Sequence, residues 1–288
     1  MVDYNPKDWF TFIFRIHKAD TVRKLMPLMI GIAIYAGLIA VLELRIWKLS
    51  DKSYIRNLTT MHTVLTFVIS MLLVFRTNSA YDRWWEGRKL WGSLVNHSRN
   101  LAIKIDAYVH EEHDRKYLAT LLAVFPYALK NHLRGVYKPE ELKPVDAMLN
   151  TQKHIPSQIA AAIFQRLQLL QLQGTIRPES MLVLNPEFQG LMDVCGGCER
   201  IKTTPIPFSY SVFIKKFIFI FVMTLPFGYV FMLGYWVIPV VTFIFYVLAS
   251  LELIAEEIEN PFGFDANDLP LEKISETISS NVHGLLDN

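Results

Sequence analysis

The stretch RTNSAYDRWWEGRKLWG, residues 76–92, directly follows residues 57–75, which contain no Asp, Glu, Lys or Arg. Those 19 uncharged residues, rising about 1.5 Å each in a helix, would cross about 30 Å of hydrocarbon. The side chains that come next are typical of a membrane interface on its cytoplasmic side: Arg76, Arg83, Trp84, Trp85, Arg88, Lys89 and Trp91. An ordinary interfacial belt with no further role has the same composition, so composition alone leaves both interpretations of this run open.

The overall composition also favours a membrane protein. Of the 288 residues, 52% are hydrophobic, and the mean hydropathy is +0.25, which fits a membrane protein better than a soluble domain. A charged fraction of 19% leaves a substantial water-exposed part. The net charge is only +2, from 29 basic and 27 acidic residues, and no nucleic-acid-binding motif is present. We therefore expect no nucleic-acid partner.

Four membrane spans are predicted. The first covers residues 25–42 and the second residues 57–75. Residues 217–251 carry no charge, and this stretch is too long for one span but suits two that are joined by a tight turn near Gly234. The third helix must then begin before Lys215 and Lys216, whose side chains would reach towards the interface or line something wet.

The distribution of basic residues predicts that both chain ends lie in the cytoplasm. An even number of spans places the ends on one side together with residues 76–207, and that side is rich in Lys and Arg, although the opposing loop also carries four basic residues. No cleaved signal peptide is predicted. The chain divides into an interfacial N-terminal segment (1–24), spans one and two (25–75), a cytosolic helical domain (76–207), spans three and four (208–255) and an acidic C-terminal segment (256–288).

The segments outside the spans have helical patterns. Apolar residues recur at three- and four-residue steps in residues 117–129 and again in residues 159–172, and no alternating strand pattern is present. Pro205 and Pro207 are expected to break the helix before the third span. A helix lying on the membrane surface is predicted near the N-terminus, with an apolar face of Trp9, Phe10, Ile13 and Ile16.

The sequence contains only weak matches to the motifs of enzymes. Cys195 and Cys198 form one CGGC pair, which we interpret as a glycine-loosened loop or helix bend rather than a redox or zinc motif. His110 and His113 in HEEH lack the HExxH spacing of a zinc site, and a solvated helix start is favoured. No phosphate-binding loop, dinucleotide turn or nucleophile elbow is present. The chain is therefore not predicted to be an enzyme.

The second span has features of a pore-lining helix. Thr59, Thr63, Thr66 and Ser70 form a hydroxyl stripe, and Phe67, Met71 and Phe75 follow one another at four-residue steps beside it. Hydroxyls could meet water or ions while the apolar line forms a constriction that gates by dewetting. Packing between membrane helices is the alternative explanation of the stripe. Since four spans enclose little, a conduction path would require a homo-oligomer around one axis.

The turn after the fourth span contains oxygen ligands. Asp265 and Asp268, with Asn267 beside them and Gly263 in the turn, are a candidate calcium site. Only two carboxylates lie in this turn and the EF-hand spacing is missing. A capped turn that starts a short helix at Pro270 is the favoured alternative.

Three stretches together resemble the bestrophin channel family: residues 78–92 (NSAYDRWWEGRKLWG), residues 203–210 (TTPIPFSY) and residues 259–272 (ENPFGFDANDLPLE). Their order relative to the four spans also fits, so the resemblance covers nearly the whole chain and is nearest to the bacterial branch. It implies an all-α membrane protein that forms a homopentamer around one axial pore, with a hydrophobic neck at Phe67, Met71 and Phe75. Met71 departs from the aromatic or isoleucine residues of animal members.

The resemblance implies further features. A second constriction at the cytosolic exit is typical, and Ile176 and Met181 lie in the matching region. Animal members are calcium-activated anion channels with an acidic clasp. Asp265 and Asp268 match two positions of the clasp, whereas Phe264, Ala266 and Asn267 replace other acids. The resemblance therefore implies that no cofactor is required, and calcium is a candidate only. Bacterial members are similar in fold yet conduct cations.

The function predicted from the sequence is a passive channel of the bacterial inner membrane for small monovalent ions, with sodium favoured over anions. Its partners would be further copies of itself, membrane lipid and the permeant ions. An anion channel of the animal type and a non-conducting scaffold are the alternatives. A transporter is disfavoured because no internal repeat or midplane charge is present.

Overall fold

The structure, a computed structural model, describes residues 21–47 and 58–287. Every element in this part is helical, as predicted. The elements are α2 (Thr21–Val41), the π-helical turn η1 (Leu42–Ile46), α3 (Leu58–Tyr108), α4 (Glu112–Arg134), α5 (Pro139–Leu142), η3 (Asp146–Met148), α6 (Ile155–Leu172), α7 (Pro178–Thr203), α8 (Phe208–Leu233), η4 (Gly234–Trp236), α9 (Val237–Glu259) and α10 (Leu271–Leu286). The surface helix expected at Trp9, Phe10, Ile13 and Ile16 lies outside the described residues.

Among the described residues, three stretches are long and apolar enough to cross a membrane: Thr21–Ile46, Leu58–Tyr108 and Phe208–Glu259. The last stretch comprises α8 and α9, which fold back on each other at Gly234, where φ is +55°. Helix α8 begins at Phe208, ahead of Lys215, and the chain between α7 and α8 is broken at the two prolines. Both features are as the sequence predicts. We call α2, the first half of α3, α8 and α9 the membrane bundle.

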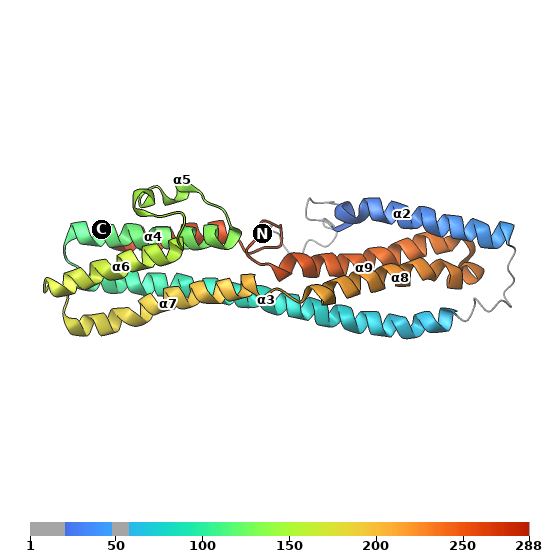
Figure 1. Cartoon of the computed structure of the whole chain (residues 1–288), viewed down its shortest axis with the longest axis horizontal. Helices are drawn as coiled ribbons and strands as arrows, with labels where there is room; N and C mark the ends of the chain where they lie inside the picture. Colours follow the sequence, from blue (N-terminus) through green and yellow to red (C-terminus); the bar gives the residue numbers. More distant parts are fainter. Residues whose placement is uncertain (1–20, 48–57, 288) are drawn as a thin grey trace.

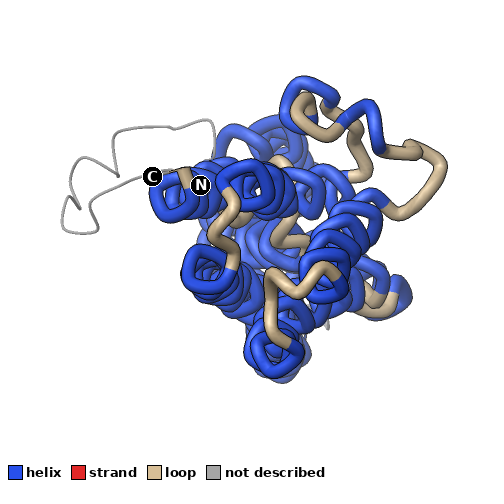
Figure 2. Tube along the Cα trace, turned by 90° about the vertical axis from the view of Figure 1, so that its left-hand side faces the viewer, coloured by secondary structure: helices blue, strands red, loops and turns tan. Residues whose placement is uncertain are grey.

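The remaining helices form a second, extramembrane bundle at the other end of an elongated molecule (Figure 1). It contains the second half of α3 with α4, α6, α7 and α10, and Figure 2 shows these helices end on. The apolar stripe of α4 is buried at Leu118, Leu121, Leu122, Phe125 and Leu129, whereas Tyr117 at its start is 38% exposed. The helical periodicity of this region is thereby confirmed.

Helix α3 joins the two bundles without a break. It is 51 residues long, so the charged run that begins at Arg76 lies in the middle of a helix. The buried apolar side chains form two separate clusters, one in the membrane bundle and one in the extramembrane bundle. Leu73 belongs to the first cluster and Trp91 to the second. One continuous helix therefore contributes side chains to both cores.

The CGGC pair lies inside α7 and not in a loop, which corrects the loop alternative of the sequence interpretation. Its second glycine, Gly197, allows α7 to approach α3, because a Cβ there would lie 2.9 Å from the Leu90 side chain. Gly190, two turns earlier, is tighter still, since a Cβ there would lie 2.5 Å from the His97 ring. Both thiols are buried, and burial raises the pKa of Cys195 to about 12. The thiols thus stay protonated at neutral pH.

This packing predicts opposite effects for two glycines on the same helix. Gly190→Ala should lower the free energy of unfolding by about 1–3 kcal/mol, because the new methyl overlaps the His97 ring. Gly196→Ala is the matched control: its added Cβ meets no heavy atom within 4 Å, and it should stabilise the helix by up to about 1 kcal/mol. Thermal unfolding in detergent measures both. Equal stability of the two variants would contradict the close approach at Gly190.

Candidate functional site

One face of α3 in the membrane bundle has no partner among the described residues of its own chain. The opposite face is buried against α8 and α9 at His62, Ile69, Leu73, Arg76 and Ala80. On the free face, the predicted apolar line is exposed, at 71% for Phe67, 50% for Met71 and 53% for Phe75. A line of this kind requires lipid, a second subunit or a pore beside it.

The four residues of the predicted hydroxyl stripe differ in their hydrogen-bond partners. Thr59 donates its hydroxyl hydrogen to the Gly228 carbonyl of α8 (3.2 Å) and so is a packing residue. Thr63, Thr66 and Ser70 donate to the carbonyls four residues earlier in α3, at 3.1, 2.7 and 2.8 Å. Their oxygen lone pairs remain available as acceptors. Thr63 and Ser70 are exposed, and Thr63 lies four residues before Phe67 on the same ridge.

A buried ion cluster lies directly below this line. Arg76 is 1% exposed and contacts two carboxylates of α9, Glu252 (Nε to Oε2, 3.4 Å) and Glu259 (Nη2 to Oε2, 2.8 Å). We call these three residues the junction cluster. Both acids are largely buried, with side chains 5% and 16% exposed, and Glu252 also lines a cavity between α2, α8 and α9. Glu256 lies outside the cluster and pairs with Lys215 at 2.8 Å.

The three stretches that carry the family resemblance meet at this level. Arg83 donates to the carbonyls of Ile201 and Thr204 (2.5 Å each) and of Glu259 (3.0 Å). The Ile206 amide donates to Glu259 Oε1 at 2.8 Å, and the Trp84 indole N–H donates to the Asn267 carbonyl at 3.0 Å.

A glycine makes part of this approach possible. A Cβ on Gly87 would lie 3.1 Å from the Phe262 ring and from Pro261. Sequence reasoning identified the three motifs but did not predict that they touch. The glycine that follows the tryptophan pair was the available signal for a close contact.

The candidate calcium pair does not converge on one point. Asp268 is buried, and its Oδ2 accepts the Asp265 amide hydrogen at 2.6 Å. The Asp265 carboxylate is 56% exposed and lies 4.0 Å from Lys24, which also pairs with Glu257 at 2.5 Å. Asn267 donates to Glu257 at 2.6 Å. The turn is thus closed by its own contacts, and α10 begins directly after Pro270.

The residues expected at the second constriction differ in exposure. Ile176 is 1% exposed and belongs to the core of the extramembrane bundle, so its side chain does not reach the surface of the chain. Met181 is partly buried against that core. Leu182, the next residue, is 77% exposed.

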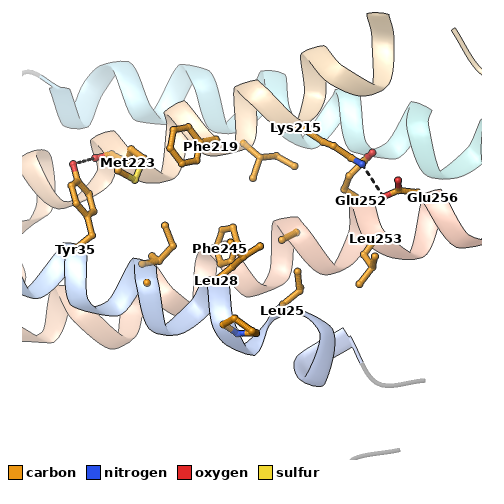
Figure 3. A pocket seen from close by; sticks show the side chains of 15 residues that line it. Leu25, Leu28, Tyr35, Lys215, Phe219, Met223, Phe245, Glu252, Leu253 and Glu256 are labelled. Carbon is orange, nitrogen blue, oxygen red and sulfur yellow. Dashed lines mark hydrogen bonds and ion pairs between the residues drawn. The ribbon is translucent and has the colours of Figure 1, made fainter. Parts of the chain in front are cut away.

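A cavity of about 590 Å³ lies between α2, α8 and α9, on helices other than the one that bears the exposed line (Figure 3). Its walls are apolar, and the Lys215–Glu256 ion pair lies at one end. Tyr35 donates its hydroxyl hydrogen to the Met223 carbonyl (2.9 Å) at the other.

Comparison with known proteins places this architecture. The sequence model of bacterial and fungal bestrophin proteins matches residues 1–284. A voltage-dependent anion channel-forming protein of Nostoc sp. is 39% identical over 230 residues, which are 76% of this chain and 75% of the relative. Another, of Mesorhizobium japonicum, is 30% identical over 285 residues, covering 96% of this chain and 90% of the relative. The crystal structure of a bacterial bestrophin homologue from Klebsiella pneumoniae, carrying one substitution, superimposes with a TM-score of 0.81 at 25% identity, covering 92% of this chain and all (100%) of that one.

The junction cluster predicts a large effect of removing its cation. Arg76→Met should lower the free energy of unfolding by about 3–5 kcal/mol, because two buried carboxylates lose their partner. Arg88→Met, at an exposed arginine of the same helix, is the control and should change stability by less than about 1 kcal/mol. Adding Glu252→Gln and Glu259→Gln to Arg76→Met should recover part of the loss. Thermal unfolding in detergent measures the stability of each variant. Equal stability of Arg76→Met and Arg88→Met would refute the stabilising role of the junction cluster.

The C-terminal turn predicts a pH-dependent effect. Burial raises the pKa of Asp268 to about 6 from an ordinary value of 3.8. The stability that the protonated carboxyl contributes is therefore complete below about pH 4 and is lost as the pH rises through about 6. Asp268→Asn keeps an acceptor for the Asp265 amide without the charge. It should be more stable than the wild type at pH 7.5, by at most about 3 kcal/mol, and this advantage should vanish by pH 4. An advantage that is independent of pH would contradict the assignment.

Proposed function

Because the chain belongs to the bacterial and fungal bestrophin family, we propose that it is a passive channel for small monovalent ions, assembled as a homopentamer around one axial pore. The family is one of ion channels and not of enzymes, and the apolar helices make the protein an integral membrane protein. The observation that carries the pore proposal is the unpartnered line of Phe67, Met71 and Phe75 on α3.

In this proposal the line forms the neck of the pore. The three side chains follow one another at steps of about 6 Å along the helix, so five copies around an axis would make three stacked apolar rings. Such a constriction excludes water until it widens, which allows it to act as a gate. The exposed hydroxyls of Thr63 and Ser70 would offer oxygen acceptors to a partly dehydrated ion. Thr59, bonded to α8, would hold the helix in place.

A second constriction would lie at the far end of the extramembrane bundle. Ile176 is buried, so it would act there only through packing, whereas Met181 is the member of the predicted pair whose side chain is partly exposed.

The permeant ions that we propose are cations, sodium foremost, by the resemblance to bacterial members of the family. Anions are the second candidate, because the relatives from Nostoc and Mesorhizobium are named anion channel-forming proteins. The acids of the junction cluster support neither sign, since both are paired with Arg76.

We further propose four spans in the inner membrane with both termini in the cytoplasm. Lipid would cover the outside, and the apolar walls of the cavity between α2, α8 and α9 suit an acyl chain.

No cofactor is needed for passive conduction. Calcium at Asp265 and Asp268 would require the turn to open, because Asp268 Oδ2 already accepts the Asp265 amide. A non-conducting scaffold is the outcome if no current is found.

The neck predicts that Phe75→Ala raises conductance or open probability in a planar bilayer, because it removes one apolar ring from the constriction. Phe219→Ala is the matched control: it is the same change at an exposed phenylalanine of α8, in the wall of the lipid-facing cavity, and it should leave the current unchanged. Currents that are equal in both variants and the wild type would remove Phe75 from the neck.

The reversal potential of the purified protein under a sodium chloride gradient, with and without calcium, decides the sign of the ion. Reversal towards the sodium potential is expected. Reversal towards the chloride potential would establish the anion candidate, and silence under both conditions would favour the scaffold.

A further inference from the structure

Two histidines and a glutamate from three helices converge in the extramembrane bundle. His132 is in the last turn of α4, His154 is the N-cap residue of α6, and Glu199 is near the end of α7. Each offers one ligand atom, and these atoms all lie within 4.8 Å of one another. Glu199 Oε1 is 2.7 Å from His132 Nε2 and 2.8 Å from His154 Nε2. We call these three residues the His–His–Glu cluster.

The two imidazole rings are oriented towards the carboxylate. Their centroids are 4.3 Å apart and their planes are perpendicular. His154 Nε2 is buried and is not satisfied by a hydrogen bond, although Glu199 Oε1 is within 2.8 Å, because the direction is unfavourable. A buried ring nitrogen without a hydrogen bond, 2.8 Å from a carboxylate oxygen and within 4.8 Å of a second ring nitrogen, is the arrangement expected of a ligand set.

The far side of one ring is already held in place. His154 Nδ1 lies 2.5 Å from the Ser157 hydroxyl oxygen. Nδ1 also accepts the Ser157 amide hydrogen at 3.3 Å, so in this arrangement Nε2 carries the proton. Metal binding therefore requires that proton to be released or to move to Nδ1, where the Ser157 hydroxyl oxygen can accept it. The contacts with Ser157 fix the ring before any ion arrives.

We propose that the His–His–Glu cluster binds a divalent transition-metal ion of the zinc class. Two imidazole nitrogens and one carboxylate oxygen are a ligand set typical of Zn²⁺, with the fourth position left to water. In a tetrahedral site with bonds of about 2.0–2.1 Å, ligand atoms lie about 3.3 Å apart. Widening the present 2.7 and 2.8 Å separations by about 0.5 Å brings Glu199 Oε1 to this distance from both ring nitrogens. Each side chain is about one-third exposed, at 34%, 30% and 35%, so an ion can enter from solvent.

A bound ion would link α4, α6 and α7, which are far apart in the sequence. Cys195 and Cys198 are fully buried, and their sulfur atoms are not among the ligand atoms that converge here. Lys202 donates to the His132 carbonyl at 3.1 Å, so one positive charge stays close to the site and is expected to moderate its affinity.

Equilibrium dialysis of the full-length protein in detergent against buffered Zn²⁺, followed by metal analysis, tests the site. The wild type should retain one zinc ion per chain. Glu199→Gln and His132→Gln should each weaken binding by about tenfold or more. The matched control is His283→Gln, which removes a histidine that contacts a single carboxylate, Asp287, at 2.8 Å, and it should bind zinc as the wild type does.

Two further readouts keep the test decisive. Zinc should raise the thermal unfolding temperature of the wild type and of His283→Gln but not that of Glu199→Gln. Cobalt bound in place of zinc should give the visible absorption of a tetrahedral site only where the cluster is intact. Absence of zinc from the wild type, or unchanged binding in Glu199→Gln and His132→Gln, would overturn the proposal.

Discussion

The structure depends on one buried arginine. Arg76 lies where the core of the membrane bundle ends and that of the extramembrane bundle begins, and it is almost without contact to solvent. A charge in that position is tolerated only if it is paired, because desolvation of an isolated guanidinium costs several kcal/mol. Glu252 and Glu259 supply the pairing, and both belong to α9. The end of α9 is therefore fixed at one height along α3.

The same contacts determine which face of α3 is left free. With Arg76 turned towards α9, the neighbouring Phe75 is rotated by about 100° and faces away from the bundle. Phe67 and Met71 lie on the same ridge and follow it. The ion pair thus orients the apolar line although it contributes no atom to it. Arg83 and Trp84, about two turns further along α3, hold the 201–206 segment and the C-terminal turn in the same way.

Much of this could be predicted from the sequence, because it depends on local patterns. Uncharged stretches located the spans, Gly234 and the two prolines located the breaks, and four-residue steps identified the exposed line on α3. Contacts between distant segments could not be predicted. Ile176 was assigned to a constriction by the family resemblance alone, yet its side chain belongs to the buried core of the extramembrane bundle. Asp265 and Asp268 are three residues apart but face in different directions. Likewise, no short motif joins His132, His154 and Glu199, which lie more than 20 residues apart in the sequence. Only the packing of α4, α6 and α7 brings them together.

The length of α3 has an electrical consequence for the proposed channel. At 51 residues the helix is about 75 Å long, more than twice the thickness of the hydrocarbon layer. Copies arranged around an axis would form a tube of which most extends beyond the bilayer. That outer part would act as a resistor in series with the neck. Even a fully widened neck would therefore not raise the unit conductance above the limit set by the bore of the extramembrane tube.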